Sequence, residues 1–281
     1  MKYEQLKDLE KDEFKRYCGV SRETFEKMVK VVKVAKILQE KSGRPSKLTI
    51  ENQILLTLMY LREYRTFFHI GKSWEIHEST AYRIVIKIEK ILISSGLFNL
   101  AGKKVLREEK NEIETIVVDV SEHEVERPKK KQKKYYSGKQ GYHTIKSQLL
   151  VNKESAEIIC TSIGKGQIHD FNLFKKSEII INKEIECLGD KGYQGIKKKH
   201  EKSRIPIKKR KNTKLSKAEK KYNSQLSKER VIVENIHRCL KIFRILSSRY
   251  RNRRKCFGLR LNLIAGIYNY ELSLKDKLSC S

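Results

Sequence analysis

The hydrophobic pattern of the chain changes near residue 105, and this change constrains the fold more than any other feature. Before it, apolar residues such as Ile54, Leu58 and Leu61 recur at helical spacing. After it, short apolar runs predict strands, with helical stretches between and behind them. The predicted strands are 114–120, 142–151, 156–163 and 185–189, and the helical stretches are 169–180 and 216–247, with a break near Ser227. This order predicts an α/β domain over 105–281 behind an all-α domain over 1–104.

The all-α region is predicted to contain a helix-turn-helix. Residues 1–40 indicate two helices, with Ser21 as the N-cap of the second, and Thr49 caps the next helix after a break at 42–46. Residues 66–71 would form the first helix of the motif, 74–77 the turn, and 78–80 the start of the second helix. Ser79, Thr80 and Arg83 are then placed to contact phosphates or base edges of DNA. Small helical bundles that bind no DNA show the same pattern. The run 256–274 predicts one more apolar helix that covers the core.

The net charge of +29 predicts a polyanionic partner whose affinity falls as salt rises. Residues 1–100 carry a net charge of +6 and the remaining residues carry +23, so most of the contact is expected in the second part. A ribosomal or chromatin-type binder would fit this charge equally well. Charge therefore indicates a partner but no activity.

The cysteines and the apolar runs of the sequence indicate the cellular compartment of the protein. The six cysteines form no CxxC pair and no zinc-type spacing, which is typical of reduced thiols in a cytosol-like compartment. The first residues are charged throughout, unlike a signal peptide, and no apolar run reaches the length of a membrane span. We expect a soluble intracellular protein with no membrane partner.

Three acidic residues stand in settings that suit metal ligands. Asp119 ends the apolar run 116–118, and Asp190 ends the run 185–189. Glu234 lies in a helical stretch with Arg230 four residues before it and Lys241 seven after, offsets that return to one helical face. Two carboxylates at strand ends and one on a basic helix face would hold a divalent metal beside a phosphodiester.

The chemistry of this arrangement follows from its charges. Three carboxylates brought together repel one another unless a cation neutralises them, and Mg²⁺ or Mn²⁺ is the natural occupant. Two such ions can activate a water on one side and stabilise the leaving oxygen on the other. Arg230 and Lys241 would contact phosphates, and His237 would touch DNA or orient a ligand.

Each of these residues has a structural alternative. An Asp that follows a strand is commonly a turn residue, and Glu234 fits a surface helix position paired with Arg230 or Arg238. Asp170 rivals Asp190, although we interpret it as the N-cap of the helix that follows. Glu122 and Glu124 rival Asp119, which is preferred because it directly follows the apolar run.

Motifs spread over nearly the whole chain carry a family resemblance. They are 42–48, 60–65, 135–139, 143–146, 166–170, 189–195 and 230–241. With these motifs the chain resembles a bacterial DDE transposase of the insertion-sequence-five family, related to the eukaryotic harbinger-type enzymes. The resemblance is closest to the branch with a helix-turn-helix in front of an RNase H-like catalytic domain.

The resemblance implies a function as well as a fold. Asp119, Asp190 and Glu234 would form the DDE triad and hold two Mg²⁺ ions, with Mn²⁺ as substitute. The enzyme would cut double-stranded DNA at the ends of its element and join the 3′-OH to target DNA. Lys139 and Lys146, within the matched motifs, would contact DNA.

The resemblance also implies an assembly and a place of action. A homodimer or larger assembly on DNA is expected, acting on the nucleoid in a bacterial cytoplasm. Two alternatives remain open: a catalytically inactive DNA-binding regulator derived from a transposase, and a cellular endonuclease without strand transfer.

Overall fold

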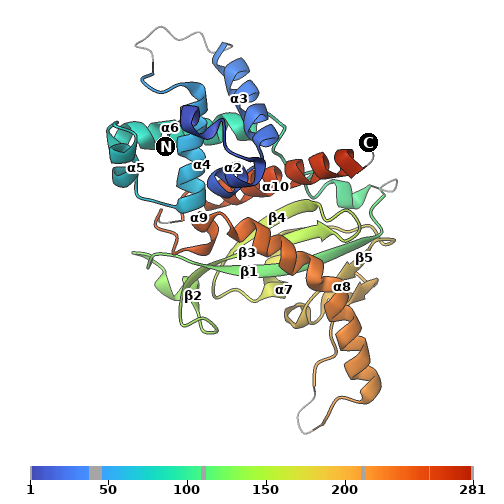
Figure 1. The fold of residues 1–281 in the computed structure, drawn as a ribbon. Coiled ribbons are helices and arrows are strands. Elements are labelled where there is room, and N and C mark those ends of the chain that lie inside the picture. The colour runs from blue at the N-terminus through green and yellow to red at the C-terminus, as the bar shows by residue number, and fades with distance from the viewer. Residues whose placement is uncertain (1, 38–45, 109–111, 210–212, 253, 280–281) are drawn as a thin grey trace. The chain divides into compact units, whose positions relative to one another are not determined.

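A computed structural model describes residues 2–37, 46–108, 112–209, 213–252 and 254–279. The chain divides into two compact units, which do not follow the order of the sequence. The first comprises Met1–Asn99, Leu240–Ser248 and Leu259–Ser281, and the second comprises Leu100–Cys239 and Arg249–Gly258. Figure 1 labels the elements along the chain.

Helices build the first unit. They are α1 (Tyr3–Leu6), α2 (Lys11–Cys18), α3 (Arg22–Ile37), α4 (Ile50–Glu63), α5 (Phe67–Ser73), α6 (Glu78–Ser94), α9 (Arg244–Ser247) and most of α10 (Phe257–Ser279). Residues 1–37 therefore contain three helices where two were predicted. Ser21 and Thr49 cap α3 and α4 as predicted, each accepting a backbone N–H at 3.2 Å. Of the predicted break, 42–45 lie outside the described residues. Among the described helices, none has the length and apolar character needed to cross a membrane.

The predicted helix-turn-helix is confirmed as α5 and α6. Thr66 caps α5, and the ring of His77 caps α6 by accepting the N–H of Ser79. Gly71 allows the tight approach between the helices, because a Cβ there would lie 2.7 Å from the backbone oxygen of Ile76. The turn therefore depends on a residue without a side chain.

The predicted C-terminal helix exists as α10, but most of it packs in the first unit. Arg260 of α10 donates to the buried Glu89 of α6 at 2.7 Å. Gly266 lies so close to the backbone of Phe98 that a Cβ would clash. The compact units thus differ from the predicted division at residue 105, because a helix late in the sequence completes the core of the early ones.

The second unit is a mixed sheet with helices. Its strands are β1 (Thr115–Glu124), β2 (Tyr136–Ser137), β3 (Tyr142–Asn152), β4 (Ile158–Lys165), β5 (Glu186–Leu188) and β6 (Ser203–Arg204), and its helices are α7 (Asp170–Lys176) and most of α8 (Lys217–Lys241). The order is β2-β3-β1-β5-β6, with β4 also paired to β3. Strand β3 runs antiparallel to β1 and β4, whereas β1, β5 and β6 are parallel to one another. The predicted α/β class is confirmed.

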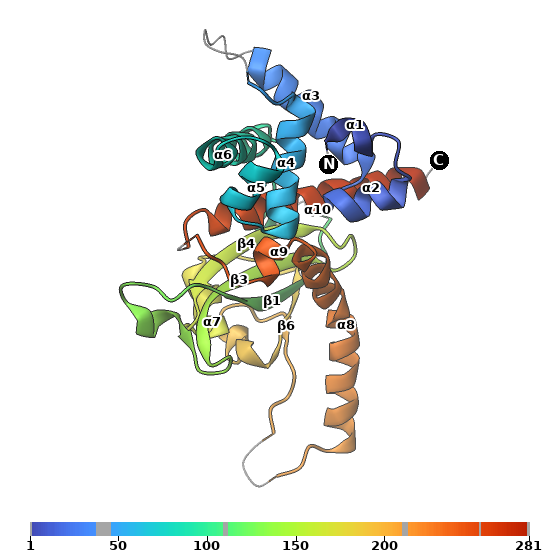
Figure 2. The ribbon, with the colours of Figure 1, turned by 60° about the vertical axis from the view of Figure 1, so that its left-hand side comes forward.

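Helix α8 differs from its prediction. It continues through Ser227 without a break and ends at Lys241, before the short α9. Helices α7 and α8 lie on opposite sides of the sheet (Figures 1 and 2). The α7 side is apolar, since Val118, Leu150 and Phe174 share one buried cluster. Because side chains alternate along a strand, Asp119 lies on the other side, toward α8.

Candidate active site

The pairing of β1 with β5 brings two of the predicted ligands together. The two strands are parallel, and Val117 lies opposite Leu188. Asp119 and Asp190 each follow these residues by two positions, and they lie close enough for the charge of Asp119 to raise the pKa of Asp190. Asp190 follows its strand as predicted. Asp119 does not end its strand, because β1 continues to Glu124.

Two side chains of α8, those of Arg230 and His237, reach the carboxylate of Asp119. A guanidinium nitrogen of Arg230 lies 3.0 Å from Oδ1, and Nε2 of His237 lies 3.3 Å from Oδ2. Asp119 and both partners are largely buried, with side chains 11–19% exposed. Arg230 and His237, which were predicted to contact DNA or, for His237, to orient a ligand, instead meet Asp119 at the sheet face under α8.

Asp190 is held by the backbone that follows it. Its Oδ1 accepts the N–H of Gly192 at 2.8 Å. Burial raises the pKa of Asp190 above its usual value, and the Gly192 N–H lowers it, while Asp119 adds a repulsive charge that raises it. Charge on this carboxylate is therefore costly unless a cation stands nearby.

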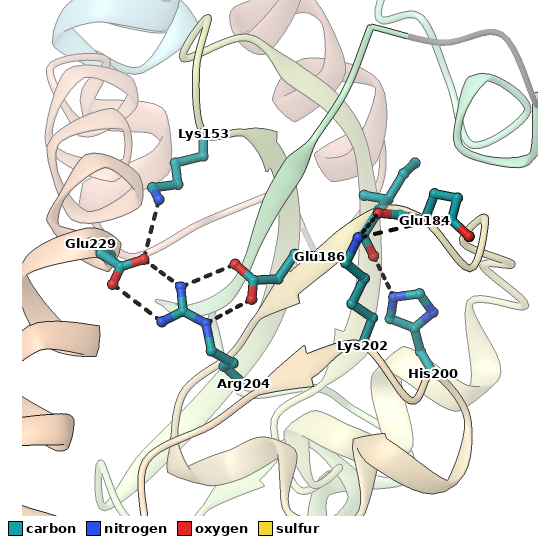
Figure 3. Close-up of polar contacts among 8 residues, drawn as sticks. Lys153, Glu184, Glu186, His200, Lys202, Arg204 and Glu229 are labelled. Carbon is teal, nitrogen blue, oxygen red and sulfur yellow. Dashed lines mark hydrogen bonds and ion pairs between the residues drawn. The ribbon is translucent and has the colours of Figure 1, made fainter.

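A half-buried ion-pair network fixes α8 against the sheet. Arg204 of β6 donates to both oxygens of Glu186 on β5, at 2.8 and 3.0 Å, and to Glu229 of α8 at 2.5 Å. Lys153 adds a second cation to Glu229 at 3.1 Å (Figure 3). Fork-like pairs of this kind have a defined geometry. Arg204 thus sets the position of α8 next to Asp119 and Asp190.

Glu234 lies four residues after Arg230, one turn along α8, and its side chain is exposed. It therefore emerges on the helix side that presents Arg230 to Asp119. Among the described residues, no three His, Cys, Asp or Glu side chains converge closely enough to hold a metal ion. The two aspartates nevertheless supply adjacent oxygen donors whose mutual repulsion a divalent cation would relieve, so the donor set fits Mg²⁺ or Mn²⁺.

Asp170 is not an N-cap as predicted. It is the first residue of α7, whose N-cap is His169. The carboxylate of Asp170 instead accepts from Lys146 at 2.8 Å, and Lys146 also lies 3.7 Å from Glu122. Lys146 was predicted to contact DNA, and the structure buries it between these two carboxylates. The other rival acid, Glu124, pairs with Arg249 at 2.7 Å.

The other predicted DNA contacts lie on the surface to differing degrees. Lys139 is exposed in the turn between β2 and β3, and Lys241 is exposed at the end of α8. Arg83 is exposed on α6. Ser79 and Thr80 are half-buried, and the Ser79 hydroxyl is tied to the ring of His77 at 2.8 Å.

A basic groove beside β4 was missed by sequence reasoning. Its volume is about 820 Å³, and the described residues that line it include Lys134, Lys165, Lys176 and Arg254 but no acid. Arg254 lies over the ring of Tyr135 at 4.3 Å. These cations are far apart in sequence, and only the net charge of the second part signalled such a surface.

Comparisons with known proteins identify the family of the chain. Residues 118–269 match the DDE superfamily endonuclease family, and residues 46–98 match the helix-turn-helix of DDE superfamily endonucleases. The chain is 53% identical over 275 residues to a probable transposase for insertion sequence element IS702 from Microchaete diplosiphon, covering 98% of this chain and 100% of the relative. The chain belongs to the DDE transposase family.

The two family matches cover both the proposed site residues of this DDE transposase and its helix-turn-helix. The endonuclease match begins one residue before Asp119 and includes Asp190 and Glu234. The helix-turn-helix match covers α4, α5 and α6. The endonuclease match also runs into α10, so it extends across residues of both compact units.

Proposed function

We propose that this protein is a transposase that cuts DNA at the ends of an insertion sequence and joins the freed 3′-OH to target DNA. The observation that carries the proposal is the adjacency of Asp119 and Asp190 under a helix that bears Arg230 and Glu234. Asp119, Asp190 and Glu234 would hold two ions of Mg²⁺ or Mn²⁺. Ions bound there would activate the attacking oxygen and stabilise the leaving oxygen of a phosphodiester.

The residues of the chain supply positioning and charge for this reaction. Gly192 fixes one oxygen of Asp190 and leaves the other oxygen for a ligand. Arg230 holds its guanidinium against Oδ1 of Asp119 and offsets part of the negative charge of the carboxylates. His237 contacts the opposite oxygen of Asp119 and orients that carboxylate. At this one site, water would attack the phosphodiester at the element end first. The freed 3′-OH would then attack the target strand.

Three surfaces would bind the DNA. Helix α6 exposes Tyr82, Arg83 and Lys87, which suits recognition of the terminal repeats. The basic groove beside β4 suits the phosphate backbone. The third surface is the basic arm, defined as residues 205–209 and 213–222 between β6 and the first turns of α8. It projects from the sheet (Figures 1 and 2) and carries exposed lysines at 214, 217, 220 and 221.

Joining two ends to one target calls for two active sites, so we propose a homodimer or larger assembly on DNA. Such an enzyme would act on the nucleoid in a bacterial cytoplasm. Sedimentation of the protein with and without end DNA tests the assembly. A single protein copy on each DNA molecule, at concentrations that support joining, would contradict it.

The decisive functional test is strand transfer. A pre-cleaved element end with a free 3′-OH is incubated with target plasmid and Mn²⁺. We expect covalent joining, which a cellular endonuclease would not give. An inactive DNA-binding regulator would bind the end without either cutting or joining it. Asp119→Asn serves as the matched control, because it keeps the fold and the DNA surfaces while removing a ligand charge.

A further inference from the structure

A chain of buried polar contacts lies behind Asp190. The ammonium of Lys146 is 2.8 Å from Oδ1 of Asp170 and 3.7 Å from Glu122. Thr144 donates its hydroxyl to the other oxygen of Glu122 at 2.9 Å. The side chains of Lys146, Glu122 and Asp170 are 11%, 12% and 25% exposed. Lys146 is therefore committed to two carboxylates and has little access to a phosphate.

The position of Lys146 on the sheet separates it from the face that carries Asp119. Lys146 lies opposite Glu122 in the β1–β3 ladder, and directly opposed residues share a face. Glu122 is an even number of residues from Val118, which packs against the α7 side. The side chain of Asp119 is on the other face. Lys146 therefore lies on the α7 face of the sheet, and Asp119 lies on the opposite face.

The second oxygen of Asp170 packs against the segment that holds Asp190. A Cβ placed on Gly192 would stand 2.7 Å from Oδ2 of Asp170 and 2.9 Å from Oδ1 of Asp190. Gly192 is thus confined between the two carboxylates while its N–H binds Asp190. The carboxylate of Asp170 thus packs directly against the segment 190–192. Its negative charge is also close enough to raise the pKa of Asp190.

We propose that Lys146 and Asp170 are positioning residues for Asp190. Lys146 neutralises Asp170 and holds it against Gly192, so that Asp190 stays in the place where it takes a divalent ion. Without Lys146, the free charge of Asp170 repels Asp190 or competes for the ion. The inference rests on the proposed function and goes beyond it, since it gives Lys146 a role in ion binding and not in DNA binding.

The test compares Lys146→Met with Lys139→Met, which removes an exposed lysine from the neighbouring β2–β3 turn. Two properties of each full-length variant are measured: affinity for duplex DNA without divalent ions, and the rise in melting temperature on adding Mn²⁺ without DNA. For Lys146→Met we expect unchanged DNA affinity and a half-saturating Mn²⁺ concentration raised about tenfold or more, as for groups that orient metal ligands. For Lys139→Met we expect weaker DNA binding and an unchanged response to Mn²⁺.

Three further variants distinguish a loss of ion binding from a simple loss of folding. Adding Asp170→Asn to Lys146→Met removes the uncompensated charge that lies next to Gly192 and Asp190, so the double variant should return to within about threefold of the wild-type Mn²⁺ response. Lys146→Arg should also rescue it, because the cation is retained. Gly192→Ala should impair the Mn²⁺ response with Lys146 intact, since its Cβ displaces one of the two carboxylates.

The outcomes separate this inference from the proposed function. If Lys146→Met weakens DNA binding as Lys139→Met does and leaves the Mn²⁺ response unchanged, Lys146 is a phosphate contact and the inference is wrong. Failure of Asp170→Asn to rescue Lys146→Met would equally overturn it. If the wild-type protein neither responds to Mn²⁺ nor cuts DNA, the proposed function fails and the inference fails with it.

Discussion

Asp190 occupies a position that is unfavourable for a charged carboxylate. Burial, and then the charges of Asp119 and Asp170, raise its pKa, while the N–H of Gly192 and the charge of Arg230 lower it by less. A group whose folded pKa is raised binds protons more readily in the folded state than in the unfolded state. The contribution of Asp190 to the stability of the folded protein is therefore largest below the pKa that Asp190 has in the unfolded state. This contribution is lost as the pH rises through the pKa that it has in the folded state. The metal-free protein bears this cost at neutral pH.

Asp190→Asn is accordingly expected to stabilise the metal-free protein. The amide oxygen keeps the contact with Gly192, while the buried charge is removed. The midpoint of urea unfolding should be higher than that of wild type near neutral pH, and the difference should disappear as pH falls below 3.8, the ordinary pKa of an aspartate. Added Mn²⁺ should raise the wild-type midpoint only. A variant less stable than wild type at every pH would contradict this expectation.

Several site residues were predictable from the sequence, and others were not. Asp119 and Asp190 follow apolar runs, and parallel pairing brings such positions together. Asp170, in α7, was misassigned as an N-cap, because its partner Lys146 lies on β3 and the spacing of the two residues in the sequence gives no sign of the contact. The ion pairs of Arg204 likewise join residues from three elements that no local pattern connects.

Among the elements, α10 shows most clearly how packing overrides sequence order. Its Arg260 and the Glu89 of α6 are almost fully buried, with side chains 3% and 1% exposed. Burial raises the pKa of Glu89, and Arg260 opposes that shift.

Helix α8 shows in another way that a local pattern can mislead. A break was predicted at Ser227, yet this exposed residue follows the buried Leu226 and leaves the helix continuous.

Arg260→Met is expected to destabilise the first unit by about 3–5 kcal/mol, because it leaves a buried carboxylate without its partner. Urea unfolding followed by circular dichroism measures the decrease in stability. The double variant with Glu89→Gln should recover most of it, since no unpaired charge remains. Equal stability of wild type and Arg260→Met would show that α10 does not complete this core.

The element that reads the DNA ends is expected to be α6. Arg83→Gln removes an exposed cation near the start of this helix and should weaken binding to the element ends by about 1–3 kcal/mol. Electrophoretic mobility shift with end DNA and with unrelated DNA measures the effect. Lys11→Gln, on α2, is the control and should change neither affinity. An equal weakening for both DNAs would assign Arg83 to phosphate contact without specificity.

Over the whole molecule, the net charge of +29 is concentrated in the second part of the chain, and the basic arm presents part of it. The arm is structurally anchored: Asn223 exchanges two hydrogen bonds with the backbone of Ile207, and Ser216 and Glu219 form a capping box at the start of α8. Its lysines are thus held on a defined support and should contact phosphates.

Changing Lys214, Lys217, Lys220 and Lys221 to Gln should reduce the salt dependence of DNA binding. For every phosphate that the variant no longer neutralises, the slope of log affinity against log salt should become shallower by about 0.9. Fluorescence anisotropy at several salt concentrations measures the slope. The matched control changes four exposed lysines of α2 and α3 (Lys11, Lys27, Lys30 and Lys33). An identical slope change for both sets would mean that the arm binds no phosphates of its own.

The central claim is that Asp119, Asp190 and Glu234 form one metal-dependent catalytic site. The most direct measurement is nicking of a supercoiled plasmid that carries the ends of the element, in Mg²⁺ or Mn²⁺. We compare wild type with Asp119→Asn, Asp190→Asn and Glu234→Gln, and use Glu201→Gln, an exposed acid away from these residues in sequence, as the control. We expect ion-dependent nicking at the ends by wild type and the control, and none by the other three. Nicking that persists in any of those three would contradict the claim.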